Sequence, residues 1–180
     1  MRNPSFARWV MTIALVSTLL QGCSTVNISD YAGERPVLDL KSYFNGPVKA
    51  SGIVQNRSGR VIKRFTVDID ARWTGDTGTL DEHFVYADGT TQQRVWTVRK
   101  GTDGRYVGTA ADVVGEASGE AAGNALRWRY VLEVPVDGRT YHVDFDDWMF
   151  LVSDKVLINR TSMSKFGFGV GEITISFTKP

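Results

Sequence analysis

The sequence predicts an all-β protein, an antiparallel up-and-down meander of about eight to ten strands that closes into a barrel. Apolar and polar residues alternate with a period of two over residues 65–73, as expected for a half-buried strand. The same alternation recurs over residues 126–134 and 173–178. Turn signals such as Asp88-Gly89 and Asp137-Gly138 separate the alternating runs, which is typical of antiparallel hairpins.

The segments between these turns are expected to be strands, each antiparallel to the next. An open sheet of this length would leave two edges able to pair with other chains, and closure into a barrel removes them. The only helical candidate is a short turn over residues 39–43, with Asp39 as its N-cap. The predicted strands cover residues 48–55, 61–73, 79–86, 91–100, 105–110, 113–117, 125–134, 140–151, 156–166 and 170–178.

The apolar register changes within the eighth predicted strand. Val143 and Phe145 share one face, but Trp148 and Phe150 have the opposite parity. A β-bulge at residues 146–147 would restore one continuous buried face. Alternatively, the second half of the strand is buried on both faces. The pattern leaves both readings open.

Residues 1–22 have the features of a bacterial signal peptide. Arg2 and Arg8 give the start of the chain a positive charge. An apolar run of about a dozen residues follows, which is too short to cross a bilayer. The run ends at Leu20-Gln21-Gly22-Cys23, which resembles the bacterial lipobox. In that motif the cysteine receives diacylglycerol before cleavage makes it the first residue of the mature protein. The alternative is a simple secreted protein in which the cysteine is incidental.

Lipidation of Cys23 predicts a protein that is anchored to a membrane without spanning it. Cys23 is the only cysteine, so an internal disulfide is impossible. Ser24, rather than an aspartate, follows it, and by resemblance to lipoprotein sorting rules this favours the outer membrane, facing the periplasm. We expect residues 23–36 to be the lipidated N-terminus and a tether, and residues 37–180 to form a single β-barrel domain.

Composition argues against nucleic acid as a partner. The chain has 21 Lys and Arg against 20 Asp and Glu, so it lacks the basic excess that a polyphosphate backbone requires. His83 and His142 are the only histidines, each on a predicted strand beside carboxylates, and a zinc site needs three or four converging ligands. No metal or cofactor is expected, and the sequence identifies no protein partner.

Two motifs could carry chemistry, and each has a structural explanation. Gly167, Gly169 and Gly171 suggest a phosphate loop, but a strand pattern follows where a helix is needed, so a hairpin or barrel corner is predicted. The adjacent carboxylates at residues 146–147 could act as general acid and base, or one could form an ion pair with Arg160. We assign no catalytic residue.

The C-terminal part of the chain resembles a family of uncharacterised proteobacterial lipoproteins, a domain of unknown function. The resemblance is carried by residues 146–150 (DDWMF), 157–160 (LINR), 165–167 (KFG) and 170–174 (VGEIT). It covers essentially the whole chain, since the lipobox and residues 40–46 also fit. Such proteins are similar in layout to the calycins, the lipocalin-like barrels that hold apolar ligands. The resemblance therefore implies a lipocalin/calycin-like barrel, and it implies no catalytic residue.

Aromatic residues on the inward parity of the strands would form the wall of a ligand cavity, with a few polar groups to orient the ligand. The candidate ligand-binding residues are Trp128, Tyr130, Tyr141, Asp147, Trp148, Asn159 and Arg160.

The function that these observations favour is an outer-membrane-anchored, periplasm-facing lipoprotein that binds a lipid or fatty-acyl ligand in envelope maintenance. Two alternatives remain at this stage. One is a structural lipoprotein whose filled barrel docks an envelope partner. The other is a lipid-modifying enzyme that uses Asp146 or Asp147 inside the barrel.

Overall fold

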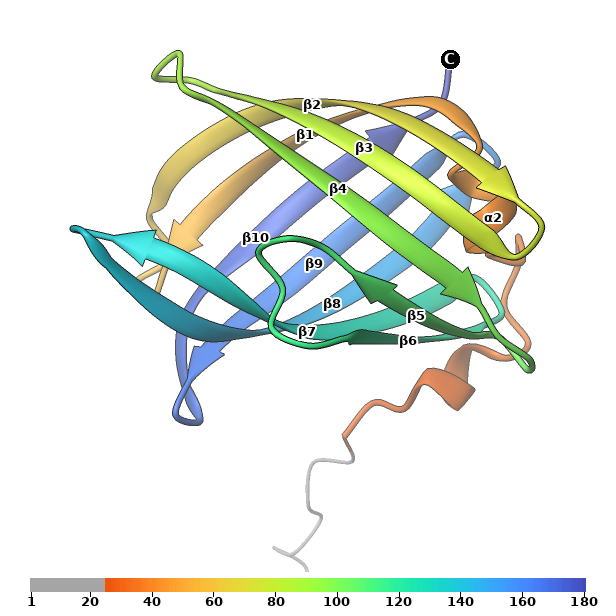
Figure 1. Ribbon diagram of the computed structural model, residues 1–180. Helices are drawn as coiled ribbons and strands as arrows, with labels where there is room; N and C mark the ends of the chain where they lie inside the picture. Colours follow the sequence, from red (N-terminus) through yellow and green to blue (C-terminus); the bar gives the residue numbers. More distant parts are fainter. Residues whose placement is uncertain (1–24) are drawn as a thin grey trace, which may run out of the picture.

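The computed structural model describes residues 25–180 and shows a closed barrel of ten antiparallel strands (Figure 1). The predicted all-β meander is confirmed. The expected signal peptide, residues 1–22, and Cys23 lie outside the described residues. Within residues 25–180, no helix is long and apolar enough to cross a membrane. The strands are β1 (Gly46–Asn56), β2 (Val61–Thr74), β3 (Thr77–Tyr86), β4 (Thr91–Lys100), β5 (Arg105–Thr109), β6 (Ala117–Ala122), β7 (Ala125–Val136), β8 (Arg139–Ser153), β9 (Val156–Lys165) and β10 (Phe168–Thr178).

Each strand pairs with its neighbours in sequence, and the first and last strands pair with each other. β1 and β10 are antiparallel from the pair Lys49 and Thr178 to the pair Asn56 and Gly171. This pairing leaves no open edge, so side chains of one parity point into a closed interior and those of the other parity point outward.

The sixth strand lies later in the chain than the sequence predicts. The segments between turns predict this strand over residues 113–117, but β6 begins at Ala117. Val113 instead makes an isolated antiparallel bridge to Leu132. The connection between β5 and β6 is therefore a loop that crosses toward β7, and it carries Asp112 to the barrel interior.

β8 contains no bulge at residues 146–147, because its pairing with β7 runs without a shift from Phe150 to Arg139. Trp148 and Phe150 therefore lie on the outside of the barrel, with ring centroids 6.2 Å apart. A 3₁₀ helix, η2 (Ile28–Tyr31), lies against β6 and β7 and places the Tyr31 ring 5.3 Å from Phe150. The second half of β8 is thus covered on both faces, as one of the two alternatives proposed.

Part of the segment expected to be a tether contacts the barrel. Ile28 is buried, and Tyr31 packs on the outer aromatic pair of β8. Just after the expected tether, the backbone N–H of Leu38 donates a hydrogen bond to the carbonyl of Gly123, 2.8 Å away. The sequence pattern showed no periodicity here because a single turn of 3₁₀ helix is too short to display one.

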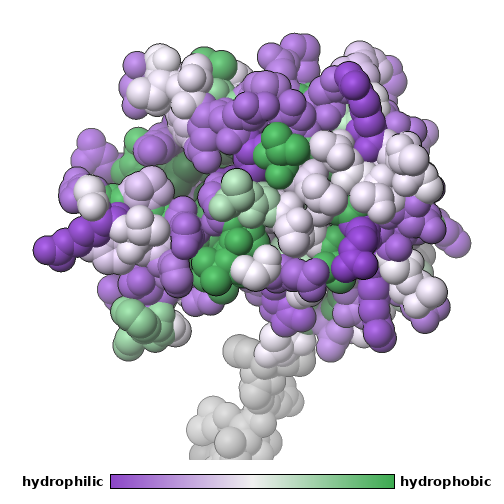
Figure 2. Space-filling view, viewed as in Figure 1, coloured by the Kyte–Doolittle hydropathy of each residue, from purple (hydrophilic) through white to green (hydrophobic). Residues whose placement is uncertain are grey.

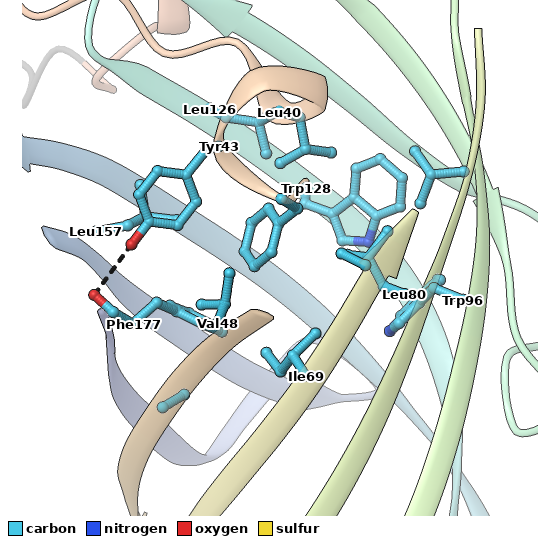
Figure 3. Close-up of a cluster of buried hydrophobic side chains, with 14 of the residues drawn as sticks. Leu40, Tyr43, Val48, Ile69, Leu80, Trp96, Leu126, Trp128, Leu157 and Phe177 are labelled. Carbon is cyan, nitrogen blue, oxygen red and sulfur yellow. Dashed lines mark hydrogen bonds between the residues drawn. The ribbon is translucent and has the colours of Figure 1, made fainter. Parts of the chain in front are cut away.

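The short helix α2 (Leu40–Tyr43) closes one end of the barrel (Figure 1). As predicted, Asp39 caps it, accepting hydrogen bonds from the backbone N–H groups of Lys41 at 2.9 Å and Ser42 at 3.3 Å. The Tyr43 hydroxyl donates to the carbonyl of Phe177, 3.1 Å away (Figure 3). These bonds hold the apolar side chains of α2 against the barrel core.

The core at the α2 end combines large side chains with inward-facing glycines. Figure 3 shows Leu40, Trp96, Trp128 and Leu157 converging beneath the helix. Three aromatic rings lie opposite glycines on neighbouring strands and cover the space that a Cβ would occupy. These cross-strand pairs are Phe65 with Gly52, Trp73 with Gly78 and Trp128 with Gly119.

Gly119→Ala should lower the free energy of unfolding by about 1–3 kcal/mol, the usual cost of overpacking a core. The new methyl group would meet the Trp128 ring, which is only 5% exposed and has little room to move. Urea unfolding followed by circular dichroism would measure the loss. Gly169→Ala is the matched control, since nothing lies within 4 Å of its added Cβ. Equal stability of the two variants would contradict this account of the core.

Candidate functional site: a polar belt in an apolar cavity

The barrel interior holds a cavity of about 590 Å³. Its lining includes the exposed residues Ile62, Val136 and Val170, so it opens to solvent at the end opposite α2. The face of the molecule shown in Figure 2 is mostly hydrophilic, with patches of hydrophobic surface between the polar side chains. Most of the cavity wall is apolar and includes Phe65, Val67, Leu80, Phe84, Phe145 and Ile173.

Seven polar side chains interrupt this apolar wall at mid-depth, and we call them the polar belt. Glu82 on β3 lies between the inward residues Leu80 and Phe84. Asp147 on β8 lies in the same way between Phe145 and Met149. Apolar surface therefore continues above and below the polar groups. The belt consists of Glu82, Arg94, Asp112, Tyr130, Asp147, Asn159 and Thr161.

Arg94 and Asp112 form a bidentate ion pair on one side of the cavity. The Arg94 Nε lies 3.0 Å from both carboxylate oxygens of Asp112, and Nη2 lies 2.7 Å from Oδ2. The guanidinium also lies over the Phe84 ring, 5.6 Å from its centroid. Glu82 is directly opposite Arg94 in the pairing of β3 with β4. The carboxyl groups of Glu82 and Asp112 thus both lie beside the Arg94 guanidinium. Of the two, Asp112 forms the bidentate ion pair.

On the opposite wall, β8 and β9 contribute buried groups with unused hydrogen-bonding capacity. Asp147 is directly opposite Thr161 in the strand pairing, and the Asn159 side-chain N–H donates to the Thr161 hydroxyl at 3.1 Å. Asp147 and Asn159 are only 5% and 2% exposed. Within the described part of the chain, Oδ1 of Asp147 and Oδ1 of Asn159 have no hydrogen-bond partner.

The belt contains two carboxyl groups that titrate near neutral pH. Burial raises the pKa of Asp147 to about 7, and the Thr161 and Tyr130 hydroxyls oppose this shift only in part. Burial also raises the pKa of Glu82 to about 7, although the positive charge of Arg94 lowers it. For Arg94, burial lowers the pKa, but the hydrogen bonds with Asp112 and the nearby negative charges of Glu82 and Asp112 together hold it above the ordinary value.

Of the seven residues that the sequence marks as ligand-binding, five line the cavity and two do not. Arg160 lies on the outside of β9, where its Nη2 is 3.5 Å from Glu172. Trp148 lies on the outside of β8, where the Arg127 guanidinium is 5.1 Å from its ring centroid. For these two the expected inward orientation is wrong, because adjacent residues of a strand point to opposite faces. Those that line the cavity are Trp128, Tyr130, Tyr141, Asp147 and Asn159.

The same parity separates Asp146 from Asp147. Asp146 faces outward and accepts a hydrogen bond from the Arg127 Nε, 2.8 Å away. The two carboxylates therefore do not share a site, and Arg160 is not the ion-pair partner of either one. His83 and His142 are exposed beside Asp81 and Glu133. No group of three or more His, Cys, Asp or Glu within residues 25–180 is arranged to hold a metal ion.

Four belt residues escaped the sequence analysis: Glu82, Arg94, Asp112 and Thr161. A signal was present for the first two, since Glu82 shares the inward parity of Leu80 and Arg94 that of Trp96. A charged residue on the apolar parity of a strand is a candidate interior group. Asp112 had no such signal, because it belongs to a loop whose path depends on the rest of the barrel.

Solved structures support the fold. The S-type phycobiliprotein lyase CPES of Guillardia theta matches with a TM-score of 0.57 and 8% identity, over 86% of this chain and 98% of that one. A protein of unknown function from the DUF3598 family of Nostoc punctiforme matches with a TM-score of 0.55 and 12% identity, over 82% of this chain and 51% of that one. No curated protein sequence matches. A family model described as "Protein of unknown function (DUF3833)" matches residues 17–179.

The raised pKa of Asp147 has a consequence for stability. Between pH 4 and 7 the unfolded chain releases this proton while the folded protein retains it, so folding loses stability as the pH rises. Asp147→Asn removes the titrating group. Its free energy of unfolding, relative to the unchanged protein, should rise by on the order of 3 kcal/mol from pH 4 to pH 8.

Urea unfolding at the two pH values would measure this difference. Asp144→Asn is the control, because Asp144 lies on the same strand with its side chain exposed outside the barrel. A pH-independent effect of Asp147→Asn would show that the carboxyl titrates normally in the folded protein.

Proposed function

The chain belongs to the DUF3833 family, and we propose that it is a lipocalin-like lipid-binding lipoprotein of the bacterial cell envelope. In this proposal Cys23 carries the lipid anchor, the protein faces the periplasm from the outer membrane, and the barrel holds a lipid or fatty-acyl ligand for storage or transfer.

The observation that carries the proposal is the cavity itself. Its volume of about 590 Å³ is within the range of about 300–1,000 Å³ common for small-molecule sites. It combines an apolar wall with a few polar groups, which suits a ligand with a long apolar portion and one polar group. Exposed apolar residues stand at its opening, among them Ile62, Val136 and Val170. These side chains give an apolar ligand an apolar contact surface at the entrance.

The cavity does not fit the alternative of a filled barrel. Apolar side chains fill the interior only toward α2, and the remaining space reaches the open end. The enzymatic alternative uses Asp146 or Asp147 inside the barrel; Asp147 lines the cavity, while Asp146 faces outward and cannot act as its acid or base partner there. Binding is therefore the activity that the geometry supports best.

The anchor rests on the sequence of the N-terminal segment. Leu20, Gly22 and Cys23 resemble a lipobox at the end of a short apolar run. Two or more acyl chains on one cysteine would give lasting membrane attachment. The contacts of Ile28 and Tyr31 with the barrel would then keep the folded domain close to the membrane surface.

A cavity-filling substitution tests the binding site. Met163→Trp should displace bound lipid, because Met163 lines the cavity and a larger indole would occupy ligand volume. Lipid extracted from the purified unchanged protein would be identified and quantified by mass spectrometry, and we expect at least a severalfold loss in the variant. Ser162→Trp, on the exposed outer face of the same strand, should retain the lipid. An unchanged protein that carries no lipid and takes none up would refute the proposed binding function.

Substitution of the lipidation site tests the anchor. Cys23→Ala should move the protein from the membrane fraction to the soluble fraction and abolish incorporation of labelled palmitate in bacterial cells. Ser24→Asp should retain the label but shift the protein toward the inner membrane, if sorting follows the rule for the residue after the cysteine. Membrane association that survives Cys23→Ala would argue against a lipid anchor.

A further inference from the structure

We propose that the cavity prefers ligands whose polar group donates hydrogen bonds or is positively charged over ligands with a carboxylate or phosphate group. Long-chain alcohols and amines are the chemical classes that fit. This inference rests on the proposed lipid-binding function and specifies which polar group the polar belt accepts.

The first argument comes from the two unpartnered oxygens of the belt. Oδ1 of Asp147 and Oδ1 of Asn159 are buried, line the cavity and accept no hydrogen bond from the described residues. The Asn159 amide nitrogen donates one of its two N–H groups to the Thr161 hydroxyl. A buried acceptor without a partner is costly, and a ligand that brings an O–H or N–H would satisfy it. A ligand carboxylate has only acceptors and would leave both oxygens unpaired.

The second argument comes from the charges at mid-depth. Three carboxyl groups, those of Glu82, Asp112 and Asp147, face the cavity with one guanidinium, that of Arg94. Asp112 forms an ion pair with this guanidinium through three contacts of 2.7–3.0 Å, which involve its Nε and Nη2 atoms. An anionic ligand group at this level would therefore meet an acidic surface whose only cation already has a partner. Like charges in a site of low dielectric constant repel strongly.

The remaining cations that line the cavity stand near its mouth and have other contacts. The Lys165 ammonium donates to the carbonyl of His142 at 3.1 Å and lies 5.0 Å from the Tyr141 ring centroid. The Lys63 ammonium lies 5.1 Å from the Tyr86 ring centroid. Neither belongs to the belt, so neither supplies a counter-charge for an anion at mid-depth.

The electrostatics of the belt predict how the preference depends on pH. The carboxyl groups of Glu82 and Asp147 have pKa values raised to about 7, while Asp112 is paired with Arg94 and Tyr130 stays protonated because burial raises its pKa. Raising the pH from 6 to 8 ionises the first two groups. The affinity for an amine should then rise, that for a carboxylate should fall, and that for an alcohol should change least.

The experiment compares dodecylamine, 1-dodecanol and dodecanoate, which share one chain length and differ in the polar group. Delipidated full-length protein is loaded with the neutral apolar dye N-phenyl-1-naphthylamine, and each compound is titrated at pH 6 and pH 8. At pH 8 the amine and the alcohol should displace the dye at concentrations about tenfold below that of dodecanoate, a difference of about one ionic contact. Dodecanoate binding as tightly as the other two would overturn the inference.

Two substitutions assign the preference to the belt. Asp147→Asn and Glu82→Gln should each reduce the advantage of dodecylamine over 1-dodecanol severalfold at pH 8, with the dye affinity of each variant measured first so that displacement is compared at equal dye occupancy. Asp144→Asn, on the outer face of β8, should change nothing. An amine advantage that survives both belt substitutions would overturn the assignment. Failure of the dye and all three compounds to bind would refute the proposed function as well, whereas tight binding led by dodecanoate would refute this inference alone.

Discussion

The pairing of β1 with β10 is the constraint on which the rest of the structure depends. These strands lie at opposite ends of the folded chain, and their ladder from Lys49 and Thr178 to Asn56 and Gly171 turns a long meander into a closed surface. In a closed barrel the inward residues of all strands share one interior. Strand parity then decides which residues meet, so Asp147 enters the cavity while its neighbours Asp146 and Trp148 are excluded from it.

One end of the barrel interior is packed and stabilises the fold, and the other end retains space for a ligand. Toward α2 it is packed with large apolar side chains, and the hydrogen bonds of Asp39 and Tyr43 hold the helix in place. Toward the open end it retains a cavity crossed by buried charged and polar groups. Buried carboxyl groups with raised pKa values lower stability at neutral pH, and proteins commonly accept such a cost at functional sites.

The N-terminal segment connects the barrel wall to the proposed anchor. η2 covers the outer aromatic residues of β8, the strand whose inner face carries Asp147. Within β8 the apolar residues change from one face to the other, and contacts on both faces of the sheet explain this change. The inner face of β8 lines the cavity, while its outer face packs against the Tyr31 ring.

The sequence by itself determined the strand meander, the turns, the capped helix at Asp39 and the barrel, because period-two alternation and glycine turns are local signals. It also indicated five residues that line the cavity. Only the tertiary structure decided the path of the β5–β6 loop, and this path sets the Arg94–Asp112 ion pair. The packing of Tyr31 in η2 on β8 was likewise decided by the tertiary structure. These features join residues far apart in the chain, and a local pattern carries no information about which distant side chain will face it across a closed interior.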